Sequence, residues 1–114
     1  MNIEQFREYC LKMNGVTEDF PFDNTTLVFR VGNKIFALMN VDRFEYVNLK
    51  CEPARALDLR EQYSGIRPGY HMNKQHWNSV YAGQDVPDQL FYELALHSYE
   101  LIKASLPAAI RKTL

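Results

Sequence analysis

The segment PGYHMNKQHWNSV, Pro68–Val80, concentrates side chains that can bind a ligand, including two of the three histidines and the only tryptophan. Lysine and imidazole groups can contact phosphates, asparagine can hydrogen-bond a base edge, and aromatic rings can stack on bases. The same groups can meet an acidic protein surface, so the residue types leave both kinds of partner open. The candidate nucleic-acid-binding residues are Lys50, Arg67, His71, Asn73, Lys74, His76 and Trp77.

The sequence shows no residue spacing that is typical of a metal site or a catalytic site. His71 and His76 are five residues apart, whereas ligands on one face lie four apart in a helix and two apart in a strand. Neither Cys10 nor Cys51 has a neighbour in sequence that would activate its thiol. No GxSxG, HExxH or phosphate-binding glycine loop occurs. We therefore expect a non-enzymatic protein with no cofactor and no metal.

Size and composition predict one globular domain spanning residues 1–114. Hydrophobic residues make up 46% of the chain and charged residues 24%, average values for such a domain. No segment approaches the roughly 18 apolar residues that cross a bilayer, no signal peptide is evident, and the two cysteines are typical of free thiols. These features predict a cytoplasmic monomer with no membrane partner. The net charge of −1 argues against strong non-specific binding of nucleic acid.

The N-terminal half is expected to form one helix followed by antiparallel strands. An apolar residue every three to four positions predicts a helix over residues 2–13, with Asn2 as its N-cap. The Gly32-Asn33 pair is typical of a hairpin turn. The predicted strands are a short one at 19–22 and longer ones at 25–31, 34–40 and 44–50.

The C-terminal half alternates helices and strands. Pro53 begins a helix that reaches Gln62, with Glu52 near its N-cap. We expect Ala54, Ala56 and Leu57 to face inward from it. The remaining predicted elements are strands at 66–71 and 75–81 and a helix from Pro87 to Ser105.

This order of elements predicts an α+β fold of two layers. Strands joined by short turns pair antiparallel, and the helices then cover one face of the sheet. Trp77, Ser79 and Tyr81 point to one face of the last strand. We interpret Trp77 as part of the sheet–helix interface, and Asn73 and Lys74 as the turn before the strand, with Asn73 tolerating a positive φ. The alternative places Trp77 at the surface, where it could stack or contact a partner.

The chain contains, in order, the segments PFDNTTLVFRVGNKIFALMN, VNLKCEPARALDLREQY, IRPGYHMNKQHWNSV and VPDQLFYELALHSYELIKASLP. Together they resemble the MmcQ/YjbR family of small bacterial proteins, over a span from about Phe6 to Pro107. The resemblance implies a single domain with a CyaY-like fold, an antiparallel sheet with helices packed on it, also described as a double wing. The recurring family residues at matching positions are Lys34, Lys50, His71, Asn73, Lys74, His76 and Trp77.

The resemblance also implies a DNA-binding module, with double-stranded DNA as its partner. Lys50, Arg67 and Lys74 would then contact phosphates, and Asn73 and His71 would assist them. Family members often carry a basic residue after Lys74, whereas this chain has Gln75. This difference removes a positive charge from the proposed interface.

Two other functions remain open. A protein- or peptide-interaction module could use the same surface or an exposed sheet edge for strand addition. Frataxin-like metal handling would need a cluster of acids on the first helix, where only Glu4 and Glu8 lie one turn apart. Charge reversal separates the first two functions, because Lys74→Glu should abolish DNA binding and leave a contact with an apolar peptide intact.

Overall fold

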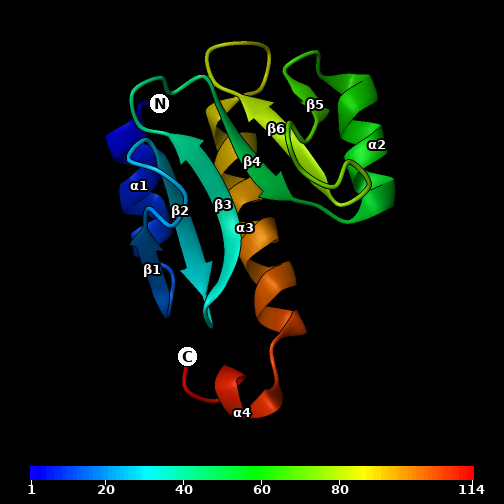
Figure 1. The fold of residues 1–114 in the computed structure, drawn as a ribbon. Coiled ribbons are helices and arrows are strands. Elements are labelled where there is room, and N and C mark those ends of the chain that lie inside the picture. Colours follow the sequence, from blue (N-terminus) through cyan, green and yellow to red (C-terminus); the bar gives the residue numbers. More distant parts are fainter.

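The computed structural model describes residues 1–114 as a six-stranded antiparallel sheet with helices on one face (Figure 1). The strand order across the sheet is β1-β2-β3-β4-β6-β5. This confirms the expected α+β class, and the short α4 is the one helix that the sequence did not predict. No helix is both long enough and apolar enough to cross a membrane. The elements are α1 (Ile3–Leu11), β1 (Val16–Asp19), β2 (Thr26–Val31), β3 (Lys34–Asn40), β4 (Tyr46–Lys50), α2 (Pro53–Gln62), β5 (Ile66–Pro68), β6 (Trp77–Tyr81), α3 (Asp88–Ser105) and α4 (Ala108–Arg111).

Helix α3 crosses behind the centre of the sheet and holds it in place (Figure 1). Its buried Phe91 packs edge-on against Phe6 of α1, with ring centroids 5.6 Å apart. The buried hydroxyl of Ser98 donates to the carbonyl of Phe36 at 2.6 Å and accepts from the N–H of Lys50 at 2.8 Å. These contacts fix one face of β3 and β4 against α3, so the opposite face of the sheet points away from every helix.

The starts of α1 and α2 follow from local sequence. The side chain of Asn2 accepts from the N–H of Gln5 at 2.9 Å, and the side chain of Gln5 accepts from the N–H of Asn2 at 3.0 Å, as in a capping box. The carboxylate of Glu52 accepts from the N–H groups of Ala54 and Arg55 at 3.1 and 3.0 Å. These two bonds favour the charged carboxylate and lower the pKa of Glu52. The expected caps are therefore present at both helices.

The first strand lies earlier in the chain than expected, because β1 ends at Asp19, where the predicted strand begins. Pro21 has no N–H to donate to a sheet ladder. The carboxylate of Asp23 then accepts from the N–H groups of Thr25 and Thr26 at 2.9 and 2.6 Å. Residues 20–25 consequently form a loop instead of a strand.

The inward face of α2 also differs from expectation. Ala56 and Leu59 are buried, as is Ile66 of the neighbouring β5, whereas Ala54 is exposed and Leu57 is 58% exposed. The helix lies at the edge of the sheet and buries only a narrow stripe (Figure 1). The sequence pattern does not reveal which stripe that is, because Leu57 and Leu59 are equally apolar.

We predict that Leu59→Ala lowers the free energy of unfolding by about 2–5 kcal/mol, because it leaves a cavity between α2 and the sheet. Leu57→Ala on the same helix is the matched control and should change it by no more than about 0.5 kcal/mol, because that side chain already lies in water. Urea unfolding followed by circular dichroism measures both variants. Equal losses would contradict the orientation of α2.

Candidate functional site

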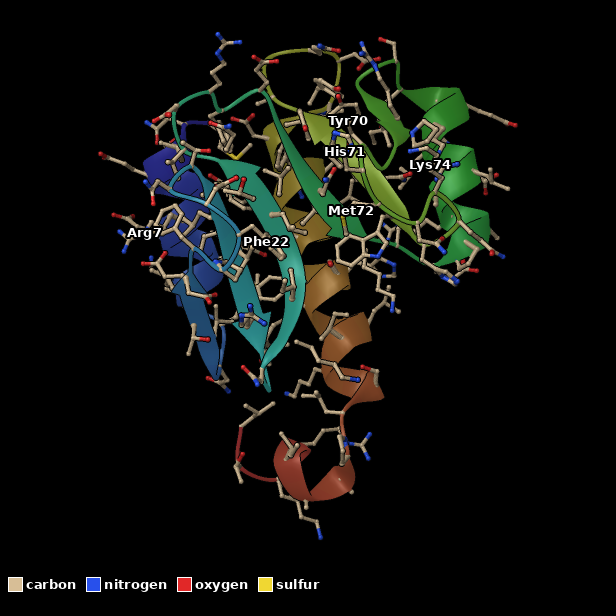
Figure 2. All side chains as sticks on the ribbon, in the orientation of Figure 1. Arg7, Phe22, Tyr70, His71, Met72 and Lys74 are labelled. Carbon is tan, nitrogen blue, oxygen red and sulfur yellow. The ribbon has the colours of Figure 1, made fainter.

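The face of the sheet opposite the helices, called here the outer face, carries alternate residues of its strands. Two loops, residues 20–25 and 69–76, lie over it. Figure 2 shows Phe22 of the first loop on one side of this face, and Tyr70, His71 and Met72 of the second loop on the other. The outward residues of β2, β3, β4 and β6 are Thr26, Val28, Arg30, Ile35, Leu38, Asn40, Tyr46, Asn48, Lys50, Trp77, Ser79 and Tyr81.

Between the two loops lies a hollow of about 570 Å³, called here the aromatic groove. This volume falls within the roughly 300–1,000 Å³ of pockets that bind small molecules. Eight of its 12 lining residues are hydrophobic, and none is an aspartate, glutamate, lysine or arginine. The groove is therefore suited to a neutral ring or an apolar side chain. The lining residues are Phe22, Thr26, Ile35, Leu38, Met39, Asn40, Tyr46, Asn48, Tyr70, His71, Met72 and Trp77.

Two buried polar side chains fasten the 69–76 loop to the outer face. The amide nitrogen of Asn48 donates to the carbonyl of Tyr70 at 3.0 Å, and the hydroxyl of Ser79 accepts from the N–H of Tyr70 at 2.9 Å. The Ser79 hydroxyl also donates to the side-chain oxygen of Asn48. These three bonds form the Tyr70 anchor. Because Asn48 and Ser79 are buried, removing the loop would leave their polar atoms without partners.

The backbone around the anchor is tightly constrained. His71 has a φ of 60°, in the left-handed region that a residue with a side chain rarely adopts. Its ring packs against that of Tyr70, with centroids 4.0 Å apart. A Cβ on Gly69 would lie only 2.8 Å from the Cβ of Trp77 and 2.9 Å from its carbonyl oxygen. The close contact between the backbone of residue 69 and Trp77 therefore requires glycine. The positive φ expected at Asn73 therefore occurs at His71 instead.

Three of the seven candidate residues lie in or beside the aromatic groove. His71 and Trp77 line the aromatic groove, and Lys50 lies beside Trp77 as its partner in the β4–β6 register. The interpretation of Trp77 as part of the sheet–helix interface is wrong. The register of β6 turns Val80 towards the helices, and strand alternation then turns Trp77 outward.

Three other candidates shape the 69–76 loop. The side-chain oxygen of Asn73 accepts from the N–H groups of Gln75 and His76 at 2.9 and 3.2 Å. The Nζ of Lys74 donates to the carbonyl of Gly69 at 2.8 Å, and Figure 2 shows Lys74 lying towards α2, away from Phe22. The carbonyl of His76 accepts from the N–H of Cys51 at 2.8 Å. These polar groups fold the loop, and their role in binding stays a prediction.

The seventh candidate, Arg67, ends a row of aromatic rings on the outer face. Tyr46 contacts Tyr70 edge-on at 6.2 Å and Tyr81 at 5.1 Å between ring centroids. The guanidinium of Arg67 lies over the ring of Tyr81, 4.4 Å from its centroid. This set of four residues, called here the tyrosine row, continues the aromatic surface beyond the groove.

Sequence reasoning missed most of this aromatic surface. Tyr46 and Tyr81 carried a usable signal, because each alternates with polar Asn48 or Ser79 along its own strand. Phe22 carried none, because it lies in a loop and no periodicity places it over the sheet.

Arg60 of α2 also went unrecognised, although it supports the base of the loop. Its Nε donates to the side-chain oxygen of Asn78 at 2.7 Å. Its Nη2 donates to the carbonyl of Trp77 at 3.3 Å and also to the carbonyl of Lys74. Arg60 thus links α2 to both ends of the turn that precedes β6.

Charge is distributed unequally on the outer face. The one carboxylate at an outward strand position, Asp19, forms an ion pair with Arg30 at 2.9 Å. Lys50, Arg67 and Lys74 belong to none of the ion pairs in the structure. The strands of the outer face and the 69–76 loop therefore carry unpaired positive charge, whereas the 20–25 loop carries the carboxylate of Asp23. The whole chain has a net charge of −1.

The other titratable groups form no second site. No three His, Cys, Asp or Glu side chains lie close enough together to hold a metal ion. Both thiols are buried, and burial raises the pKa of Cys10 and of Cys51, which disfavours the reactive thiolate. His97 accepts from the N–H of Glu52 at 3.2 Å, and burial lowers the pKa of its imidazole. These groups have structural surroundings that do not activate them.

We predict that Ser79→Ala lowers the free energy of unfolding by about 1–3 kcal/mol, because it leaves buried groups of the Tyr70 anchor unpaired. The Tyr70 amide should also exchange its hydrogen faster, as measured by NMR. Ser105→Ala is the control, because it removes a hydroxyl that bonds a carbonyl within α3, far from the loop. Unchanged exchange at Tyr70 in Ser79→Ala would show that the anchor does not hold the loop.

We predict that Asp23 titrates below the ordinary aspartate pKa of about 3.9, because the N–H groups of Thr25 and Thr26 lower its pKa. A lowered pKa in the folded state stabilises the 20–25 loop above the unfolded-state pKa, and this contribution is lost as pH falls through the folded-state pKa. The amide shifts of Thr25 and Thr26 in an NMR pH titration report the midpoint, and Asp23→Ala should abolish it. A midpoint at or above about 3.9 would contradict the two hydrogen bonds that Asp23 accepts from Thr25 and Thr26.

Comparison with known proteins places the chain in a family. The YjbR family model matches residues 11–101. The YbdF protein of Escherichia coli O157:H7 is 37% identical over 100 residues, covering 87% of this chain and 82% of that protein. The YjbR protein of Escherichia coli K12 is 34% identical over 115 residues, covering 100% and 98%. A crystal structure of a Deinococcus radiodurans protein matches with a TM-score of 0.92 at 35% identity, covering 98% of this chain and 86% of that one. The chain belongs to the YjbR family.

Proposed function

We propose that this protein is a non-enzymatic nucleic-acid-binding module whose interface is the outer face of the sheet. One observation carries the proposal: unpaired cations lie beside an uncharged, aromatic-lined groove. Nucleic acids present the matching pair of features, because phosphates attract lysine and arginine while bases stack on aromatic rings. DNA, the partner expected from the sequence, supplies both.

The cations of this interface are few. Lys50 lies next to Trp77, Arg67 ends the tyrosine row, and Lys74 lies at the side of the loop. A protein that neutralises about three phosphates has a salt slope of only about −2 to −3 in log K against log[salt]. We therefore expect moderate affinity that depends on stacking as well as on charge.

A peptide-binding function is the second candidate, and the composition of the groove favours it. Phe22, at its rim, is 66% exposed, and the lining is mostly apolar. An apolar side chain of a partner protein could fill the same hollow. Such a contact would depend weakly on salt, because it neutralises no phosphate.

We predict that mixed-sequence DNA, single-stranded or duplex, binds at about 50 mM salt and more weakly at about 200 mM. Fluorescence of Trp77, the sole tryptophan, and anisotropy of labelled DNA measure the binding. Lys50→Glu should weaken binding at least tenfold, because it places a negative charge beside Trp77. Lys12→Glu makes the same charge change after α1, away from the outer face, and is the matched control.

Two results would contradict this function. If neither single-stranded nor duplex DNA binds at about 50 mM salt, a condition that favours binding, nucleic acid is excluded as the ligand. Equal weakening by Lys50→Glu and Lys12→Glu would show that net charge acts and that the outer face is not the interface.

A further inference from the structure

We infer that the aromatic groove takes an unstacked base, so that the ligand is single-stranded nucleic acid and not a duplex. This inference rests on the proposed function and specifies its ligand. It differs from the expectation of double-stranded DNA that the family resemblance implies. Three features of the outer face support it: the shape of the groove, its hydrogen-bonding groups and the direction of the tyrosine row.

The shape of the groove is opposite to the shape that reads a duplex. Proteins that read base edges in the major groove of duplex DNA insert a protruding helix or ribbon into it. Here the surface is a hollow between two loops, with Phe22 on one side and Tyr70, His71 and Met72 on the other (Figure 2). In a duplex the faces of the bases are stacked on each other, so only an unpaired base can present its face to these rings.

The lining of the groove offers hydrogen-bonding groups but contains no lysine, arginine, aspartate or glutamate. The side-chain oxygen of Asn40 accepts from the N–H groups of Asp42 and Arg43 at 2.9 and 3.0 Å. Its amide nitrogen is then the group that can donate a hydrogen bond to a ligand. The imidazole of His71 and the indole N–H of Trp77 add further hydrogen-bonding groups to the lining. A base edge has both donors and acceptors for such groups, whereas a phosphate would find no lysine or arginine inside the groove.

The tyrosine row can contact the nucleotides that follow the bound base along the nucleic-acid strand. Tyr46 lines the groove and also contacts Tyr81, so the aromatic surface continues without a break to Arg67. Guanidinium planes and aromatic rings both support stacked bases in single strands. Lys50, beside Trp77, and Arg67, beside Tyr81, then lie where the backbone phosphates of such a strand would pass.

The test compares a single strand of about 20 mixed-sequence nucleotides with its own duplex at about 50 mM salt, by anisotropy and by Trp77 fluorescence. We expect the single strand to bind at least tenfold more tightly and to quench Trp77 to saturation. Phe22→Ala should weaken single-strand binding about tenfold through lost stacking. This variant should fold, because Phe22 is 66% exposed.

The matched control is Phe20→Ala. Phe20 lies in the same loop and is 46% exposed, but it lines a different hollow between α1 and β2. Duplex binding equal to or tighter than single-strand binding would overturn this inference and leave the proposed function intact. Absence of binding by both forms would overturn both proposals. If Phe22→Ala and Phe20→Ala weaken single-strand binding equally, the aromatic groove is not where the base binds.

Discussion

The hydrogen bonds that Asn48 and Ser79 make to the backbone of Tyr70 hold the whole outer face in shape. Both side chains are buried on a sheet face that no helix covers, so they would lose their partners if the 69–76 loop moved away. The loop is therefore part of the folded core of this face. It places His71 and Met72 at one wall of the aromatic groove before any ligand arrives, which lowers the entropy cost of binding.

One-sided packing of the helices explains how a chain with a net charge of −1 can present a cationic surface. Helix α3 occupies one face of the sheet and leaves the other to loops. On that face the carboxylate of Asp19 is neutralised by Arg30, while Lys50 and Arg67 have no acidic partner. Local charge and not total charge sets the attraction for an anionic ligand, because salt screens charges more than about 10 Å apart.

The aromatic rings of the outer face form a contiguous surface that is partly exposed, and such patches often mark a binding site. Trp77 and Tyr46 are partly buried, while Phe22 lies largely in solvent. The constrained loop keeps part of these apolar rings exposed to solvent. A ligand that covers them buries apolar surface, which favours binding.

Sequence by itself determined the order of the elements from α1 to α3, the Asn2 and Glu52 caps and the alternation that places Trp77 and Tyr81 on one face. These features depend on neighbours along the chain. The tertiary structure decided which face that is, since a strand's period of two is the same whether its apolar residues meet a helix or a loop. It also brought Phe22 opposite Met72, although 50 positions separate them, because the folds of two loops over one sheet leave no periodic trace in sequence.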